Sequence, residues 1–251
     1  MKKVIFLGAK KIGYECFDYL IKKAEEFNFQ VVGLLSNNTV KRFASGYDLA
    51  AIAQVANVPV LGGLEDLCTM DYDILISVQF HEILKKHHIE SAKEIAVNLH
   101  MAPLPEYRGC NQFSFAIIDE AKEFGTTIHK MEPGIDSGDI LFERRFPIPD
   151  SIFVEDLYEI TYNESVLLFQ NSIGKLISGD YTLKPQSSFH NRPKGFHLRN
   201  EIDELKKLDL SWPRDKIERY IRATSMPGFD GPYFTVADKK LVINLSAKRE
   251  L

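Results

Sequence analysis

Short, continuous apolar runs alternate with amphipathic segments through the first half of the chain. The runs over residues 4–8 and 29–36 contain few polar positions, which is typical of parallel strands covered on both faces. Between them, apolar residues recur near helical spacing. Strands are therefore expected over 4–8, 29–36, 58–61, 72–78 and 94–99, and helices over 9–27, 47–56 and 111–121. This alternation predicts an α/β protein with a doubly wound, Rossmann-like, mostly parallel sheet.

The pattern changes after residue 124. We expect two further strands over 125–131 and 139–146, followed by a long amphipathic helix over 154–178. Two short helices are expected over 201–207 and 213–223, and a β-hairpin is expected over 233–237 and 240–244. The stretch 181–198 is polar and shows no regular period, so we place a domain boundary near Asp180. The sequence thus predicts a main domain over 1–180 and a small α+β domain over 181–251.

The composition is that of a globular protein, because 45% of the 251 residues are hydrophobic and 26% are charged. The formal net charge of −4 excludes a strongly basic nucleic-acid-binding protein. The charge is uneven, since residues 181–251 hold 14 Lys and Arg against 9 Asp and Glu. A mildly basic tail can meet an anionic substrate, although a solvated surface gives the same balance.

The three cysteines, Cys16, Cys68 and Cys110, show no CxxC spacing, so neither a disulfide framework nor a structural zinc site is expected. The apolar segment Val4–Leu7 is far too short for a signal peptide or a membrane span. We therefore expect a cytoplasmic protein with no metal, no nucleic-acid partner and no membrane partner.

The turn between the first strand and the first helix is a candidate anion site. Gly8 and Gly13 bracket it, and the start of a helix offers N–H groups to an anion. The spacing is not GxGxxG, because Lys10 occupies the place of the middle glycine, and it is not a P-loop. The second strand ends at Ser36 instead of an acidic residue, which disfavours a nicotinamide cofactor. A phosphate held by this turn and a purely structural turn both remain open.

A second candidate is the sequence Asn98-Leu99-His100 at the end of a predicted strand. Ligands of open α/β sheets bind at this edge. The two polar side chains are two residues apart, so they point to the same side. An amide and an imidazole can both donate a hydrogen bond to a developing oxyanion.

A third candidate is Asp136, which lies between two glycines in the loop Gly134-Ile-Asp-Ser-Gly-Asp139. A carboxylate brought beside His100 would fix the tautomer of its ring. From spacing alone, a turn in which Asp136 only hydrogen-bonds its own backbone is the favoured interpretation.

Together these motifs carry a resemblance. The sequence NLHMAPLPEYRG, followed 27 residues after Gly109 by the Asp136 of GIDSGDI, resembles the folate-dependent formyltransferase family over about residues 1–180. The resemblance implies that Asn98, His100 and Asp136 are the catalytic trio. It also implies 10-formyltetrahydrofolate as the formyl donor. Its expected binding residues are Ser77, Gln79, Phe80 and Ile135.

Two segments are similar in particular to sugar-nucleotide N-formyltransferases: 106–112 and 222–232. This similarity implies that the acceptor is the amine of a nucleotide-linked amino-dideoxysugar used in surface polysaccharide synthesis. A dTDP-linked 3-amino- or 4-amino-dideoxyglucose is the first choice, with GDP- and UDP-sugars as alternatives. The candidate substrate-binding residues are Gly8, Lys10, Tyr107, Arg108, Asn111, Trp212 and Tyr220.

Other interpretations come from different classes of protein. One is an enzyme like methionyl-tRNA formyltransferase with a short tail, and another is a non-catalytic binding module on a Rossmann-like scaffold. The oligomeric state is not encoded in a motif. The predicted terminal hairpin has an apolar face that could pair with a second subunit to form a homodimer.

Overall fold

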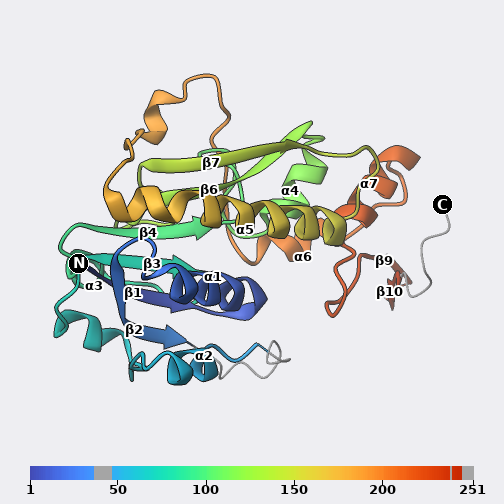
Figure 1. Ribbon diagram of the computed structural model, residues 1–251. Helices are drawn as coiled ribbons and strands as arrows, with labels where there is room; N and C mark the ends of the chain where they lie inside the picture. The colour runs from blue at the N-terminus through green and yellow to red at the C-terminus, as the bar shows by residue number, and fades with distance from the viewer. Residues whose placement is uncertain (37–46, 238, 245–251) are drawn as a thin grey trace.

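The computed structural model describes residues 1–36, 47–237 and 239–244, and its centre is a six-stranded sheet (Figure 1). The strand order is β2-β1-β3-β4-β6-β7. The strands are β1 (Lys2–Gly8), β2 (Phe29–Ser36), β3 (Ile74–Val78), β4 (Ile95–His100), β6 (Glu123–Lys130) and β7 (Ile140–Pro147). The first four run parallel, and β6 and β7 are antiparallel to their neighbours. This confirms the predicted α/β fold with a mostly parallel sheet.

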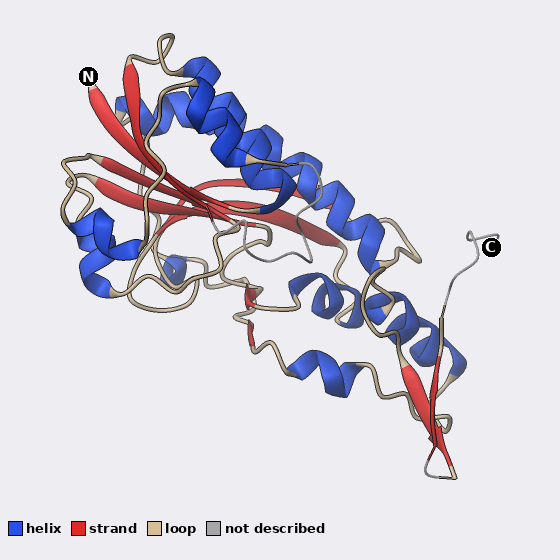
Figure 2. Ribbon diagram, turned by 90° about the horizontal axis from the view of Figure 1, so that it is seen from below, coloured by secondary structure: helices blue, strands red, loops and turns tan. Residues whose placement is uncertain are grey.

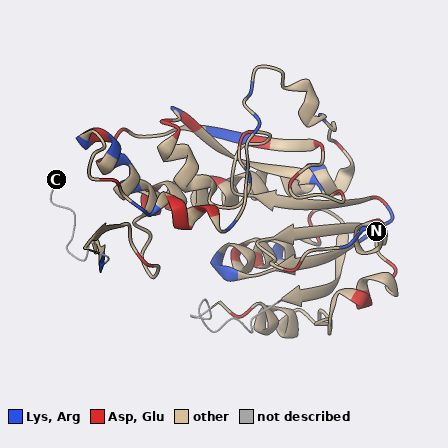
Figure 3. Cartoon of the chain, turned by 180° about the vertical axis from the view of Figure 1, so that it is seen from behind, with Lys and Arg blue, Asp and Glu red and all other residues tan. Residues whose placement is uncertain are grey.

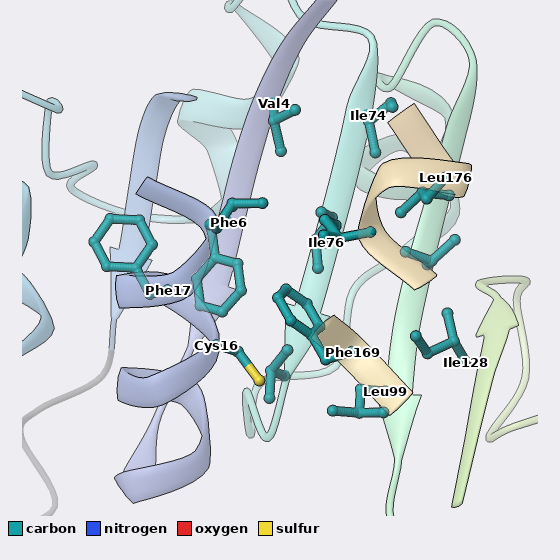
Figure 4. Packing of buried hydrophobic residues seen from close by; sticks show 14 of the residues in the cluster. Val4, Phe6, Cys16, Phe17, Ile74, Ile76, Leu99, Ile128, Phe169 and Leu176 are labelled. Carbon is teal, nitrogen blue, oxygen red and sulfur yellow. The ribbon is translucent and has the colours of Figure 1, made fainter. Parts of the chain in front are cut away.

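Helices cover both faces of the sheet, as the apolar runs predict (Figure 2). In β1, Val4 and Phe6 face the cluster that contains α1 (Lys10–Lys23) and α5 (Val154–Ser178), whereas Ile5 and Leu7 face the opposite cluster. Figure 4 shows how Phe6, Phe17 and Phe169 fill the space between the sheet and the two long helices. The central strands are thus anchored rigidly, which fixes the positions of the residues at their ends.

Three helix ends have clear local causes. The side chain of Asp48 accepts hydrogen bonds from the N–H groups of Ala50 and Ala51 and so begins α2 (Leu49–Val55). Helix α5 ends at Gly179, which has a φ of 80° that favours glycine. Helix α1 has Lys22 and Lys23 in its last turn, where cations offset the helix dipole.

The remaining elements are shorter. They are η1 (Leu64–Cys68), α3 (Lys86–Glu90), β5 (Arg108–Gly109), α4 (Gln112–Ile118), η2 (Gln186–Ser188), β8 (Phe196–His197), α6 (Glu201–Leu205), α7 (Arg214–Thr224), β9 (Tyr233–Val236) and β10 (Lys239–Val242). Strands β9 and β10 form the predicted antiparallel hairpin. The strand expected over 58–61 is wrong: in this stretch the structure has a single bridge, between Val60 and Leu34. Within the described residues, no helix is both long and apolar enough to cross a membrane.

The polar stretch after α5 forms an element that the sequence does not predict. Its β8 pairs in parallel with β5, directly after the loop that follows His100. The pairing requires glycine at two places. A Cβ at Gly109, whose φ is 84°, would overlap the carbonyl oxygen of His197, and a Cβ at Gly195 would overlap that of Glu106. This part of the tail therefore packs against the main sheet at the edge that carries the site.

Candidate active site

The last residues of β4 bring two polar side chains to the carboxyl edge of the sheet. Val97 and Leu99 face the α1–α5 side, so Asn98 and His100 point to the opposite side. On one side Asn98 is in register with Ser77 of β3, and on the other with His129 of β6. The predicted common orientation of Asn98 and His100 is confirmed by this alternation.

His100 is almost fully buried and its two ring nitrogens face oxygen atoms. The Nε2 atom lies 2.7 Å from the backbone oxygen of Tyr107, and Nδ1 lies 3.6 Å from Oδ2 of Asp136. The oxygen of Tyr107 is within hydrogen-bond distance of Nε2, whereas Oδ2 of Asp136 faces Nδ1 at the distance of an ion pair. The two oxygens therefore hold the ring in one orientation.

Asp136 lies in a tight loop and is held by groups from three segments. Its φ of 49° is left-handed. Oδ2 accepts a hydrogen bond of 2.9 Å from the N–H of Gly109, and Oδ1 lies 3.5 Å from Nε2 of His129. Burial raises the pKa of Asp136, but the charge of His100 and the hydrogen bonds from His129 and Gly109 outweigh it, so the pKa lies below its ordinary value. The carboxylate of Asp136 is thus ionised, and its partners come from other segments and not from the backbone of its own turn.

His129 is a site residue that the sequence analysis missed. Its Nδ1 donates to the backbone oxygen of Lys130 at 2.8 Å, while its Nε2 lies 3.3 Å from Nδ2 of Asn98. Nε2 also lies 3.5 Å from Oδ1 of Asp136, so the ring stands between the amide of Asn98 and the carboxylate. The sequence offers only a histidine within the predicted strand GTTIHKM, and the register of β6 against β4 cannot be deduced from it.

The turn after β1 lies where the strand order reverses, between β1 and β3. Gly8 ends β1, and Lys10 has a left-handed φ of 61°. The Nζ atom of Lys10 donates to Oε1 of Gln79 at 2.8 Å. Burial, and secondly the positive charge of Arg199, lower the pKa of Lys10. Lys10 thus lies at the point where open α/β sheets bind ligands, within electrostatic range of a second cation.

The other residues expected at the donor site lie beside the trio. Ser77 is buried next to Asn98, Phe80 is half-buried after β3, and Ile135 is 47% exposed next to Asp136. An apolar side chain therefore follows β3 and another follows β6. Such apolar side chains near the site suit the binding of a flat heterocycle. Their role in binding stays a prediction.

Tyr107, Arg108 and Asn111 bind the backbone of the protein itself. The carbonyl of Tyr107 accepts from His100, and Arg108 donates to the carbonyl of Ile135 at 3.1 and 3.0 Å. The amide of Asn111 donates to the carbonyls of Leu198 and Arg199. These contacts show that the three residues build the site; direct substrate contact stays a prediction.

Trp212 and Tyr220 lie together in the carboxyl-terminal part, at and on α7. Their ring centroids are 4.8 Å apart, and Nζ of Lys216 lies 4.0 Å from the Trp212 ring. Helix α7 packs against α4, which follows the motif loop. The structure brings the two aromatic residues to each other, and their contact with a substrate also stays a prediction.

A separate group, Glu65, Cys68, His87 and His88, has the residue types of a metal site. It lies on η1 and α3, which precede β3 and β4 and so lie at the other end of these strands from His100 (Figure 1). The N–H of Lys85 donates to Nδ1 of His88, so Nε2 carries the ring proton and donates to Glu65. His88 thus lacks the available lone pair that a metal would need at Nε2. We assign its ring to the start of α3.

The fold and the trio define a class. The strand order of the sheet reverses between β1 and β3. Its carboxyl edge carries the amide of Asn98, the imidazole of His100 and the ionised carboxylate of Asp136, and the ring of His129 lies between the amide and the carboxylate. This arrangement suits an acyl-transfer protein, because it offers donors to an oxyanion and a carboxylate to orient the imidazole.

Known proteins are similar to this chain in sequence and in structure. Residues 64–170 match the family model described as formyl transferase. A methionyl-tRNA formyltransferase of Listeria monocytogenes is 30% identical over 162 residues, 64% of this chain and 51% of that protein. The GDP-perosamine N-formyltransferase of Brucella melitensis is 28% identical over 159 residues, 63% of this chain and 59% of that protein. The chain thus spans little more than half the length of these relatives.

The crystal structure of WlaRD, a sugar 3N-formyl transferase in the presence of dTDP and 5-N-formyl-THF, superposes with a TM-score of 0.79. The two chains are 25% identical, and the match covers 96% of this chain and 84% of that one. Residues 64–170 thus resemble the formyl transferase family in sequence, and nearly the whole chain resembles this sugar formyltransferase in structure.

Proposed function

We propose that this protein moves the formyl group of 10-formyltetrahydrofolate to the amine of a nucleotide-linked amino sugar. The observation that carries the proposal is the convergence of Asn98, His100 and Asp136 at the carboxyl edge of the sheet. The match to the formyl transferase family and the likeness to a sugar formyltransferase support it. Ser77, Phe80 and Ile135 border this edge with the main-chain and apolar groups that a pterin would contact.

The folate supplies the formyl group as an activated acyl donor. In the transfer, the neutral amine of the acceptor forms a bond to the formyl carbon, and the bond from that carbon to the folate nitrogen breaks. Asn98 and a protonated His100 would stabilise the negative charge on the formyl oxygen. Asp136 would orient the ring and help a water molecule carry the proton from the attacking amine to the leaving nitrogen.

A nucleotide diphosphate fits the charges at the strand-order reversal. Lys10 and Arg199 bring two positive charges together there, and an anion between them would relieve their repulsion. The similar proteins indicate which nucleotides to consider. One relative is named for GDP-perosamine, and the structure of WlaRD was obtained with dTDP. We infer a dTDP- or GDP-linked amino-dideoxysugar, made in the cytoplasm for a surface polysaccharide.

Methionyl-tRNA is the second candidate acceptor, because several relatives carry that name. A tRNA site needs an extended basic face, since phosphate contacts dominate the affinity. In the tail, however, Arg192, Arg214 and Arg219 are paired with glutamates. Figure 3 shows acidic residues on α6 and residues of both charges on α7. The sugar nucleotide is therefore the first choice.

The acceptor can be found by incubating the protein and 10-formyltetrahydrofolate with dTDP-, GDP- and UDP-linked amino sugars and with methionyl-tRNA. We expect mass spectrometry to detect one added formyl group on an amino sugar. Raising the salt from 50 to 200 mM should change this turnover only slightly, whereas activity that depends on tRNA contacts would fall by about 1,000-fold. Formylation of the tRNA alone would select the second candidate, and no formylated product would support a binding module.

The homodimer through the terminal hairpin is also a proposal. Val236 and Leu241 are 47% and 46% exposed on β9 and β10 and lie with Phe234 on one face of the hairpin. If these side chains form an interface, Val236→Lys should convert a dimer to a monomer in sedimentation velocity. A wild-type chain that sediments as a monomer would contradict the proposal.

A further inference from the structure

The segment 184–199, which we name the crossing segment, is fastened at three points to β7 and to the loop that follows β4. At its start, Lys184 and Ile140 exchange two backbone hydrogen bonds of 2.9 Å. In its middle, the guanidinium of Arg192 binds both carboxylate oxygens of Glu143 at 2.8 and 2.9 Å. Near its end, β8 pairs with β5. The crossing segment therefore occupies a fixed position over the loop that carries Asp136.

Within the crossing segment, Gln186 binds this loop directly. Its Nε2 atom lies 2.8 Å from the backbone oxygen of Asp136 and 2.8 Å from that of Gly138. An amide nitrogen carries two hydrogens, so one side chain satisfies both carbonyls. The two bonds fix the relative positions of residues 136 and 138 without adding charge beside the carboxylate.

The backbone at this position decides where the carboxylate lies. Asp136 is left-handed, and a Cβ at Gly138 would overlap the carbonyl oxygen of Lys130, so the loop is both unusual and tightly packed. On its other side, Arg108 donates two hydrogen bonds to the carbonyl of Ile135. The loop is thus held between Arg108 and Gln186. These two side chains come from segments almost 80 residues apart in the sequence.

We propose that Gln186 is a positioning residue that acts through Asp136, and that the crossing segment thereby completes the active site. The inference rests on the proposed function. Gln186 does not need to touch a substrate. It holds the carbonyls on both sides of Ser137, so that the Asp136 carboxylate stays at the N–H of Gly109 and beside the ring of His100.

The test compares Gln186→Met, which keeps the length but removes both donors, with Gln54→Met, the same change at an exposed position on α2. Because a displacement of about 1 Å in a catalytic group can cost about 100-fold, we expect kcat to fall by 10- to 100-fold in Gln186→Met. The KM values for donor and acceptor should stay within about threefold. Gln54→Met should match the wild type.

A second readout does not depend on turnover. In protein labelled with ¹⁵N-histidine, the ring signals of His100 and His129 should shift in Gln186→Met and remain unchanged in Gln54→Met. If the wild type formylates no acceptor, the proposed function fails while these spectra still decide the role of Gln186. Unchanged His100 and His129 signals in Gln186→Met would overturn the positioning role, and so would a wild-type kcat.

Gln186→Glu separates positioning from general stability. Its carboxylate repels the two carbonyl oxygens, whereas its protonated form can donate to one of them. Since the ordinary pKa of a glutamate carboxyl is about 4.3 and the two carbonyl oxygens raise it, the kcat of this variant relative to the wild type should rise as the pH is lowered from about 7.5 to about 5. A constant ratio would contradict the proposal. If both Gln186 variants fail to fold, Gln186 is a structural residue and the proposal is wrong.

Discussion

An Asp136→Asn variant is expected to lose almost all formyl transfer while it keeps its fold. Asparagine has the same shape but no negative charge, so it can neither stabilise a protonated His100 nor help to move the proton of the amine. Removing a carboxylate that orients a catalytic histidine lowers kcat by about 10,000-fold in a well-studied case. The loss should appear in single-turnover assays as a loss of the chemical step.

Asp150→Asn is the matched control, because Asp150 is fully exposed and pairs only loosely with Lys122, at 3.9 Å. We expect its kcat and its Tm to equal those of the wild type. Asp136→Asn should also bind 5-formyltetrahydrofolate in a calorimetric titration, since the charge acts on the chemical step. Turnover of Asp136→Asn within tenfold of the wild type would show that the carboxylate has no catalytic role.

Asn98→Ala is expected to have the second-largest effect, a fall in kcat of about 100- to 1,000-fold, or about 2.7–4 kcal/mol of transition-state stabilisation. The alanine removes the amide donor that we assign to the formyl oxygen. It also removes the hydrogen bond from the amide to Nε2 of His129, whose ring lies beside Asp136. Steady-state kinetics with the identified acceptor should show that kcat falls more than KM rises.

Asn163→Ala provides the control, because Asn163 is exposed on α5. An Asn98→Asp variant adds a second test. It replaces a donor by an acceptor next to another carboxylate, so it should be at least as slow as Asn98→Ala. An Asn98→Asp enzyme that is faster than Asn98→Ala would argue against an oxyanion contact at this position.

Much of the main sheet could be predicted, because its cause is local. The strand β2 and the helix α5 begin and end where the apolar pattern predicts, at Phe29–Ser36 and Val154–Ser178. The same pattern placed Asn98 and His100 on one side of β4. The strand predicted over 58–61 is wrong, because a short apolar run also suits an extended loop beside a strand. In the structure this loop makes one bridge, from Val60 to Leu34.

The rest of the site depends on contacts between distant segments. His129 reaches Asn98 through the register of β6 against β4, and Gln186 reaches Asp136 across 50 residues. The two-residue strands β5 and β8 have no periodicity to detect, because they form only by pairing with each other. Such partners become visible once the chain is folded, whereas a motif shows only the residues that are adjacent in sequence.

The position of the crossing segment changes where the chain can be divided. A cut at Asp180, where the pattern of the sequence changes, would separate Gln186 from the loop of Asp136, Arg192 from Glu143 and β8 from β5. After Arg199, the elements α6, α7, β9 and β10 contribute none of these contacts. A chimaera with a relative that formylates a different acceptor should therefore be joined after Arg199. Exchange beyond that point would test whether the carboxyl-terminal elements select the acceptor while the loop of Asp136 keeps its support.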